Sequence, residues 1–149
     1  MLRRVKIACN SPADEWLLVF EALAALIYTR LVLIFFPFAT AMTRLGLQQT
    51  DLVTSKVNAP SQNRATAEAV GRAIRRAAQI SPLRAVCLQQ AAAAAIMLRK
   101  RKMPVALYFG VAKDDGGSLE AHAWSVCGNY IITGRPMVSK YVPITAYTI

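Results

Sequence analysis

The chain has 149 residues, of which 55% are hydrophobic and 17% are charged, so it has enough apolar residues for one domain with a core and is not a disordered segment. Lysine and arginine outnumber aspartate and glutamate by 18 to 8, which gives a net charge of +10. Such an excess forms a solvated basic surface or attracts an acidic partner, a membrane or a nucleic acid. Because zinc-finger spacing and basic motifs interleaved with aromatic residues are absent from the sequence, we do not expect nucleic-acid binding.

The number and spacing of the cysteines indicate the redox compartment and bear on metal binding. Cys9, Cys87 and Cys127 are odd in number and form no CxxC pair. This argues against a disulfide scaffold and a structural zinc site and favours a reducing compartment, so we expect a cytoplasmic protein. The sequence has a single histidine, His122, which also argues against a catalytic zinc site, and we expect no metal.

Residues 1–47 predict an apolar helical region. A long helix is expected over residues 16–36, followed by a short one over residues 40–47. The long helix has the length of a membrane span, but the charged residues Glu21 and Arg30 interrupt it. We therefore expect a buried or partner-binding helix and no membrane association.

Residues 48–63 are polar and lack periodicity, and they predict a surface loop. In residues 64–79, apolar side chains recur at helical spacing. Arg72, Arg75 and Arg76 lie on the opposite side of this predicted helix. They form a solvated face or, alternatively, contact a substrate.

The strongest helix-forming run of the chain follows Pro82, and Cys87 lies about one turn after it. The unpaired N–H groups at a helix N-terminus favour thiolate over thiol. Cys87 is therefore a candidate nucleophile, with His122 as its candidate base. The alternative interpretation is a small buried hydrophobic residue and a structural histidine.

Beyond the basic cluster at residues 99–102, the apolar period changes from helical to alternating. Four strands are predicted, over residues 104–112, 119–127, 130–133 and 141–149. Pro143 favours an edge strand or a docked tail for the last of them. An alanine-rich helix packed across such strands could bring Cys87 to His122, as papain-like and transglutaminase-like enzymes require. We expect one domain, residues 1–149, with residues 64–149 as its Cys/His core.

Four segments occur in a fixed order: CLQQA from Cys87, LRKRKMP from Leu98, FGVAK from Phe109 and LEAHAW from Leu119. With this order and separation they resemble the lasso peptide biosynthesis B2 proteins, the transglutaminase-like leader peptidases of lasso peptide maturation. The apolar residues 15–45 are similar to the amino-terminal region of that family. The resemblance implies an α+β fold with a transglutaminase-like (papain-like) core, in which the helix of the cysteine packs on a small antiparallel sheet.

By this resemblance Cys87 is the nucleophile of a cysteine protease, and His122 is its general base and acid. The backbone N–H of Cys87 is the expected first oxyanion donor. The reaction implied is hydrolysis of the peptide bond that joins leader to core in a ribosomally made lasso peptide precursor. The implied partners are a separate leader-binding B1-type protein and a macrolactam-forming cyclase. No cofactor is expected, and the sequence leaves a requirement for nucleotide open. The alternative is a non-catalytic transglutaminase-like module that scaffolds the maturation complex.

The third catalytic residue departs from the family pattern. The family has an aspartate at about the position of Gly134, whereas here no acidic residue follows Glu120. A substitute that orients the histidine would be Thr133, Asn129, Glu120 or a backbone carbonyl group. Asn129 has the competing explanation that it supports a turn.

A two-residue turn at residues 128–129 predicts that Trp124 lies opposite Thr133 on the next strand. Trp124 and Gly110 are further candidates for contact with the substrate. The alternatives are a core tryptophan and a glycine that marks a strand irregularity.

Overall fold

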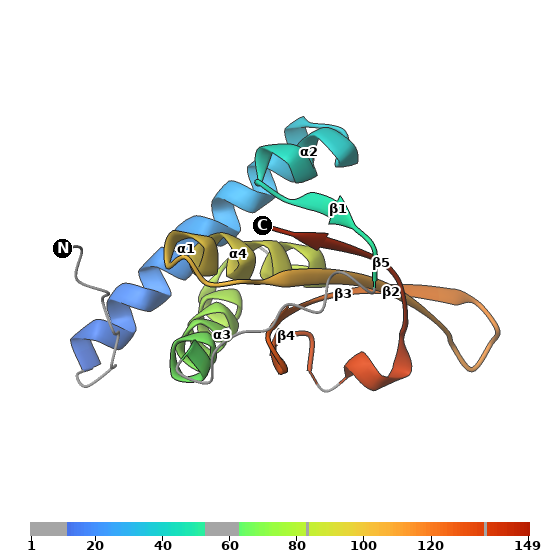
Figure 1. Ribbon diagram of the computed structural model, residues 1–149. Helices are drawn as coiled ribbons and strands as arrows, with labels where there is room; N and C mark the ends of the chain where they lie inside the picture. Colours follow the sequence, from blue (N-terminus) through green and yellow to red (C-terminus); the bar gives the residue numbers. More distant parts are fainter. Residues whose placement is uncertain (1–11, 53–62, 83, 136) are drawn as a thin grey trace.

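The computed structural model describes residues 12–52, 63–82, 84–135 and 137–149. It shows an α+β fold, as predicted, with an antiparallel sheet in the order β1-β5-β2-β3-β4 (Figure 1). The helices are α1 (Pro12–Phe35), α2 (Phe38–Arg44), α3 (Arg64–Ile80) and α4 (Cys87–Lys100). The strands are β1 (Gln48–Thr50), β2 (Ala106–Lys113), β3 (Leu119–Cys127), β4 (Tyr130–Thr133) and β5 (Val142–Thr148), and a short 3-10 helix, η2 (Met137–Lys140), precedes β5.

Helix α4 is the centre of the helical layer. It packs on β3 with one side and on α1 and α3 with others (Figure 1). Its five consecutive alanines, residues 91–95, are fully buried. Alanine is the best helix former and its small side chain lets neighbouring elements approach closely, so this run suits a helix surrounded by protein.

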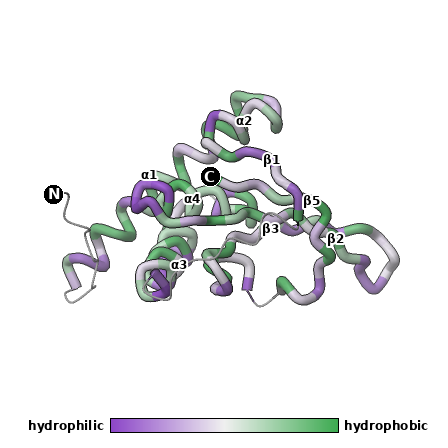
Figure 2. The backbone as a smooth tube through the Cα atoms, in the orientation of Figure 1, coloured by the Kyte–Doolittle hydropathy of each residue, from purple (hydrophilic) through white to green (hydrophobic). Residues whose placement is uncertain are grey.

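Helix α1 has two different apolar sides. The side that faces α3 and α4 is buried, with Val19, Ala22 and Leu26 in the core. The other side exposes large apolar side chains: Leu17, Phe20, Ile27, Leu31, Ile34 and Phe35. Hydrophobic residues run along most of α1 (Figure 2). By length and composition alone α1 is apolar enough to cross a membrane, and 39% of its most apolar window is buried inside the protein.

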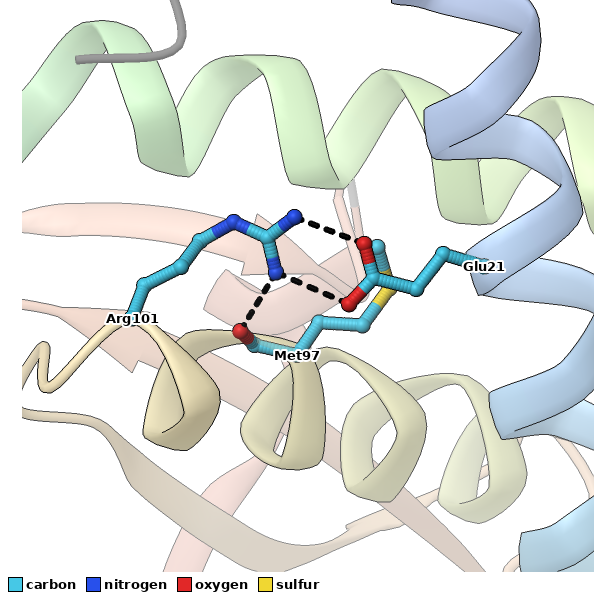
Figure 3. A network of polar contacts seen from close by, with 3 residues as sticks. All are labelled: Glu21, Met97 and Arg101. Atoms are coloured by element: carbon cyan, nitrogen blue, oxygen red, sulfur yellow. Dashed lines mark hydrogen bonds and ion pairs between the residues drawn. The ribbon is translucent and has the colours of Figure 1, made fainter. Parts of the chain in front are cut away.

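The charged residue Glu21 of α1 is paired within the helical layer. Arg101, which follows α4, donates from Nη2 to Glu21 Oε2 at 2.6 Å and from Nη1 to Glu21 Oε1 at 3.0 Å (Figure 3). Nη1 of the same guanidinium also donates to the carbonyl oxygen of Met97 at 2.7 Å. These bonds hold the pKa of Glu21 below its ordinary value, against the opposing effect of burial. A carboxylate that interrupts an apolar sequence therefore ties α1 to the end of α4.

Two expectations about the sheet were wrong. Residues 48–50, expected in the polar loop, form β1 and pair with β5, while residues 53–62 of that loop lie outside the described residues. Strand β5 is therefore interior and not an edge, since β1 and β2 flank it. Pro143 is tolerated because β1 pairs only with Ala146, Tyr147 and Thr148, so the missing N–H falls outside that ladder.

Candidate active site

Cys87 is the first residue of α4, with Val86 as the preceding cap. We predicted a helix that begins near Pro82, and the structure corrects this: Pro82 lies in the connection between α3 and α4. The turn is fixed by the side chain of Gln89, whose Oε1 accepts from the N–H of Val86 at 3.0 Å. The thiol is therefore nearer to the unpaired N–H groups of the first turn than the sequence indicated.

The environments of the two described cysteines differ. Cys87 is half-buried and packs against the edge of the core, whereas Cys127 is buried at the end of β3. Burial raises the pKa of the Cys127 thiol, which keeps it neutral and unreactive. Cys9 lies outside the described residues. Of the described thiols, Cys87 is the one suited to nucleophilic chemistry.

His122 lies on β3, opposite Gly110 of β2. Its ring is stacked between two aromatic rings, with centroid distances of 4.8 Å to Tyr141 and 6.2 Å to Trp124. Its Nε2 atom lies 3.3 Å from the carbonyl oxygen of Gly134. When Nε2 carries the proton it donates to that carbonyl, which leaves Nδ1 as the acceptor and potential base. No pattern in the sequence indicated the contact of His122 with Tyr141.

The hydroxyl candidate for the third catalytic position is engaged elsewhere. Thr133 Oγ1 lies 2.9 Å from Ser125 Oγ and also accepts from the Ser125 N–H at 3.3 Å. Thr133 pairs with Ser125 and not with Trp124, because the register of β3 and β4 shifts between Ser125 and Val126. The predicted pairing was therefore wrong by one residue, as expected where a β-bulge adds a residue to one strand. Asn129 is exposed at the turn.

Among the described contacts, Glu120 is linked to His122 through the ring of Tyr141. Its Oε2 accepts from Lys140 Nζ at 2.7 Å and from Tyr141 Oη at 3.3 Å. The Lys140 ammonium holds the pKa of Glu120 below its ordinary value. Among the described residues, the group in hydrogen-bonding distance of the His122 ring is the backbone carbonyl of Gly134, one of the substitutes the sequence left open.

The structure does not bring Cys87 and His122 into a hydrogen bond in the described part of the chain. Side chains alternate between the faces of a strand, and Ala123 and Cys127 of β3 belong to the core that contains the α4 alanines. His122 and Trp124 therefore point to the opposite face of the sheet. The assignment of Cys87 and His122 as a catalytic pair stays a prediction.

Trp124 and Gly110 form one packing unit. The Trp124 side chain is 4% exposed and stacks on Tyr108 at 5.7 Å between ring centroids. A Cβ atom at Gly110 would lie 2.7 Å from the Trp124 ring, so glycine is needed there to make room for the indole. This contact accounts for both residues without a substrate, and their role as substrate contacts stays a prediction.

A family model described as the transglutaminase-like superfamily matches residues 32–146, which is more than half of the chain. The chain belongs to the transglutaminase-like superfamily. The comparisons with curated proteins and with solved structures found no match. The transglutaminase-like fold predicted from the sequence is confirmed. This superfamily includes cysteine peptidases, and the matched residues contain both Cys87 and His122.

Proposed function

We propose that the protein is a cysteine peptidase that removes the leader from a ribosomally made lasso peptide precursor. The observation that carries the proposal is the position of Cys87 as the first residue of α4 in a transglutaminase-like domain. At this position the first-turn N–H groups point to where an oxyanion formed by attack of Cys87 would lie. The lasso-specific substrate rests on the sequence segments around Cys87 and His122 described above.

In the proposed reaction the Cys87 thiolate attacks the carbonyl carbon of the bond between leader and core. The backbone N–H of Cys87 stabilises the resulting oxyanion. The His122 imidazolium gives its proton to the leaving amine, which frees the core and leaves the leader as a thioester on Cys87. Water, deprotonated by His122, then attacks the thioester, releases the leader carboxylate and restores the thiolate.

The reaction requires His122 to reach the side of the sheet that α4 covers. The part of β3 that carries His122 is paired with β2, whereas β4 pairs only with residues Ser125, Val126 and Cys127. We propose that binding of the precursor and its leader-binding partner rearranges this segment and brings His122 to Cys87.

The proposed partners are a separate leader-binding protein and a macrolactam-forming cyclase. The exposed apolar side of α1 supports a docking role, because large contiguous apolar patches are rare on monomeric proteins and mark interaction sites. The proposed location is the cytoplasm, where thiols stay reduced.

The test is incubation of the protein with its precursor and the leader-binding protein, followed by mass spectrometry. Cys87→Ala and His122→Ala should each abolish cleavage, with circular dichroism and thermal unfolding unchanged. Cys127→Ala is the matched control, since it removes a buried thiol and should leave cleavage intact. Cleavage by a folded Cys87→Ala protein would refute the proposal.

A non-catalytic module that scaffolds the maturation complex is the second candidate. It is favoured by the separation of Cys87 from His122 across the sheet and by the carbonyl, in place of a carboxylate, beside His122. Under this alternative, Cys87→Ala leaves maturation of the peptide intact in a complex with the cyclase. Omission of the whole protein would still stop maturation of the peptide.

A further inference from the structure

Two adjacent cavities on the helical side of the molecule share lining residues, and together they form what we call the groove. The first has a volume of about 370 Å³ and lies between α1 and α3. The second has a volume of about 470 Å³ and is lined by the end of α3, the connection to α4 and the first turn of α4. Both are lined by Arg75 and Gln79, which places their meeting point near the end of α3. From Ala69 to Gln79 the helix rises roughly 15 Å, about the length of four or five extended residues.

The groove ends at the helix turn of the candidate nucleophile. Its second cavity is lined by Ala85 and Gln90, and Gln90 Nε2 donates to the Ala85 carbonyl at 3.0 Å. Residues three apart on a helix lie on the same side. Gln90 therefore shares a side of α4 with Cys87, so the second cavity is lined by a residue about one helical turn from the thiol.

The walls of the groove are strongly basic. Arg72, Arg75 and Arg76 line its first cavity, and Arg75 and Arg84 line its second. The acidic residue of the first cavity, Glu15, lies 3.4 Å from Arg76, so its charge is already balanced. In the described part of the chain, Arg72, Arg75 and Arg84 form no ion pair. Arg72, Arg75 and Arg76, which the sequence analysis interpreted as a solvated face or a substrate contact, therefore line a cavity.

The residues that line the groove favour a peptide over a single-stranded nucleic acid as its ligand. Leu18, Val19, Ala69 and Ala73 lie beneath the arginines and are at most 5% exposed, so the polar and charged side chains form most of the surface open to a ligand. The described lining residues include no aromatic ring on which a base could stack. Arginine forks pair with carboxylates in a bidentate geometry.

We propose that this groove binds an acidic segment of a peptide and directs the peptide towards Cys87. Identification of that peptide as the lasso precursor rests on the proposed function, whereas the binding of an acidic peptide does not. Because three of the arginines lack a carboxylate partner in the described structure, bound carboxylates would gain ion pairs without breaking existing ones.

The experiment measures binding of a fluorescein-labelled twelve-residue peptide of alternating Glu and Ala, by fluorescence anisotropy, to the full chain carrying Cys87→Ala. Arg75→Glu should weaken binding by about tenfold, because a close ion pair is replaced by repulsion. Lys113→Glu is the matched control: it changes the net charge equally, lies on an exposed strand end, and should change the dissociation constant by less than about twofold.

Equal weakening by the two variants would overturn the proposal, since binding would then follow net charge alone. Equal binding of a matched peptide of alternating Gln and Ala would also overturn it. Stronger binding of a twelve-nucleotide single strand, weakened by Arg75→Glu, would assign the groove to nucleic acid instead. Failure of wild-type protein to cleave the precursor would refute the peptidase and leave this binding result unaffected.

Discussion

The Nε2 atom of His122 lies 3.3 Å from the carbonyl oxygen of Gly134. A carbonyl can orient the ring and fix its tautomer, as the acid of a triad does. It has only a partial charge, so it stabilises an imidazolium less than a carboxylate would. If His122 is the general base, as proposed, the Gly134 carbonyl would orient its ring and stabilise its charged form less than a carboxylate would.

The packing around Gly134 predicts that an acidic residue cannot be introduced there without a loss of stability. The residue has a φ of +99°, and a Cβ atom would lie 2.5 Å from the Trp124 Cβ. We expect Gly134→Ala and Gly134→Asp to lower the free energy of unfolding by about 1–3 kcal/mol and to reduce cleavage. Chemical denaturation and the precursor assay measure the two effects.

Gly117 provides the control for this substitution. It also has a positive φ, +84°, but a Cβ there meets nothing within 4 Å. Gly117→Ala should therefore show the backbone cost alone and destabilise less than Gly134→Ala. Higher activity of Gly134→Asp than of wild type would contradict the packing argument.

The separation of Cys87 from His122 can be measured by cross-linking. In a protein with Cys9→Ser, Cys127→Ser and His122→Cys, a disulfide to Cys87 requires Cα atoms within about 7 Å. We expect no disulfide in the free protein, because His122 points away from α4. A disulfide should form when the precursor and the leader-binding protein are added, as detected by peptide mapping.

The same protein with Cys87→Ala controls for disulfides between molecules. Rapid cross-linking of the free protein would show that the pair meets without a partner. If the complete mixture forms no disulfide either, the scaffold function gains over the peptidase.

The Glu21–Arg101 pair predicts a pH dependence of stability. Since the pKa of Glu21 is lowered in the folded protein from its ordinary value of 4.5, its stabilisation is present above that value. It is lost as the pH falls through the lower, folded-state pKa. Glu21→Gln should reduce the free energy of unfolding at pH 7 by about 1–3 kcal/mol, and the difference from wild type should disappear in acid.

Glu68→Gln is the matched control, because Glu68 pairs with Arg64 on the exposed side of α3 at 2.9 Å. Exposed pairs of this kind contribute little to stability. Urea denaturation at a series of pH values measures both variants. A difference for Glu21→Gln that does not change between neutral and acidic pH would contradict the assignment.

Local sequence patterns predicted the elements whose boundaries depend on their own residues. Strand β3 coincides with the alternating residues 119–127, and α3 with the periodic residues that begin at Arg64. The three residues of β1 have no such pattern, because they form a strand only through pairing with β5.

The geometry of the candidate site was harder to predict, because it also depends on contacts between segments far apart in the sequence. Alternation places His122 and Trp124 on one face of β3, but it does not say which face a helix covers. That is decided by packing, since Ala123 lies in the core with the α4 alanines. The atom next to His122 is a backbone carbonyl, and a carbonyl leaves no mark in the sequence because every residue type carries one.

The exposed side of α1 leads to the last prediction. Ile27 and Leu31 lie one helical turn apart and are 49% and 47% exposed. If this side binds the leader-binding protein, Ile27→Asp and Leu31→Asp should each weaken the complex by about tenfold or more, since each buried aliphatic side chain contributes about 1.5–3 kcal/mol. Thermal unfolding of the isolated variants should be unchanged.

Leu119→Asp is the control, because Leu119 is 71% exposed on β3, away from α1. Isothermal titration calorimetry measures the affinities, and equal weakening by all three variants would exclude α1 as the specific docking surface.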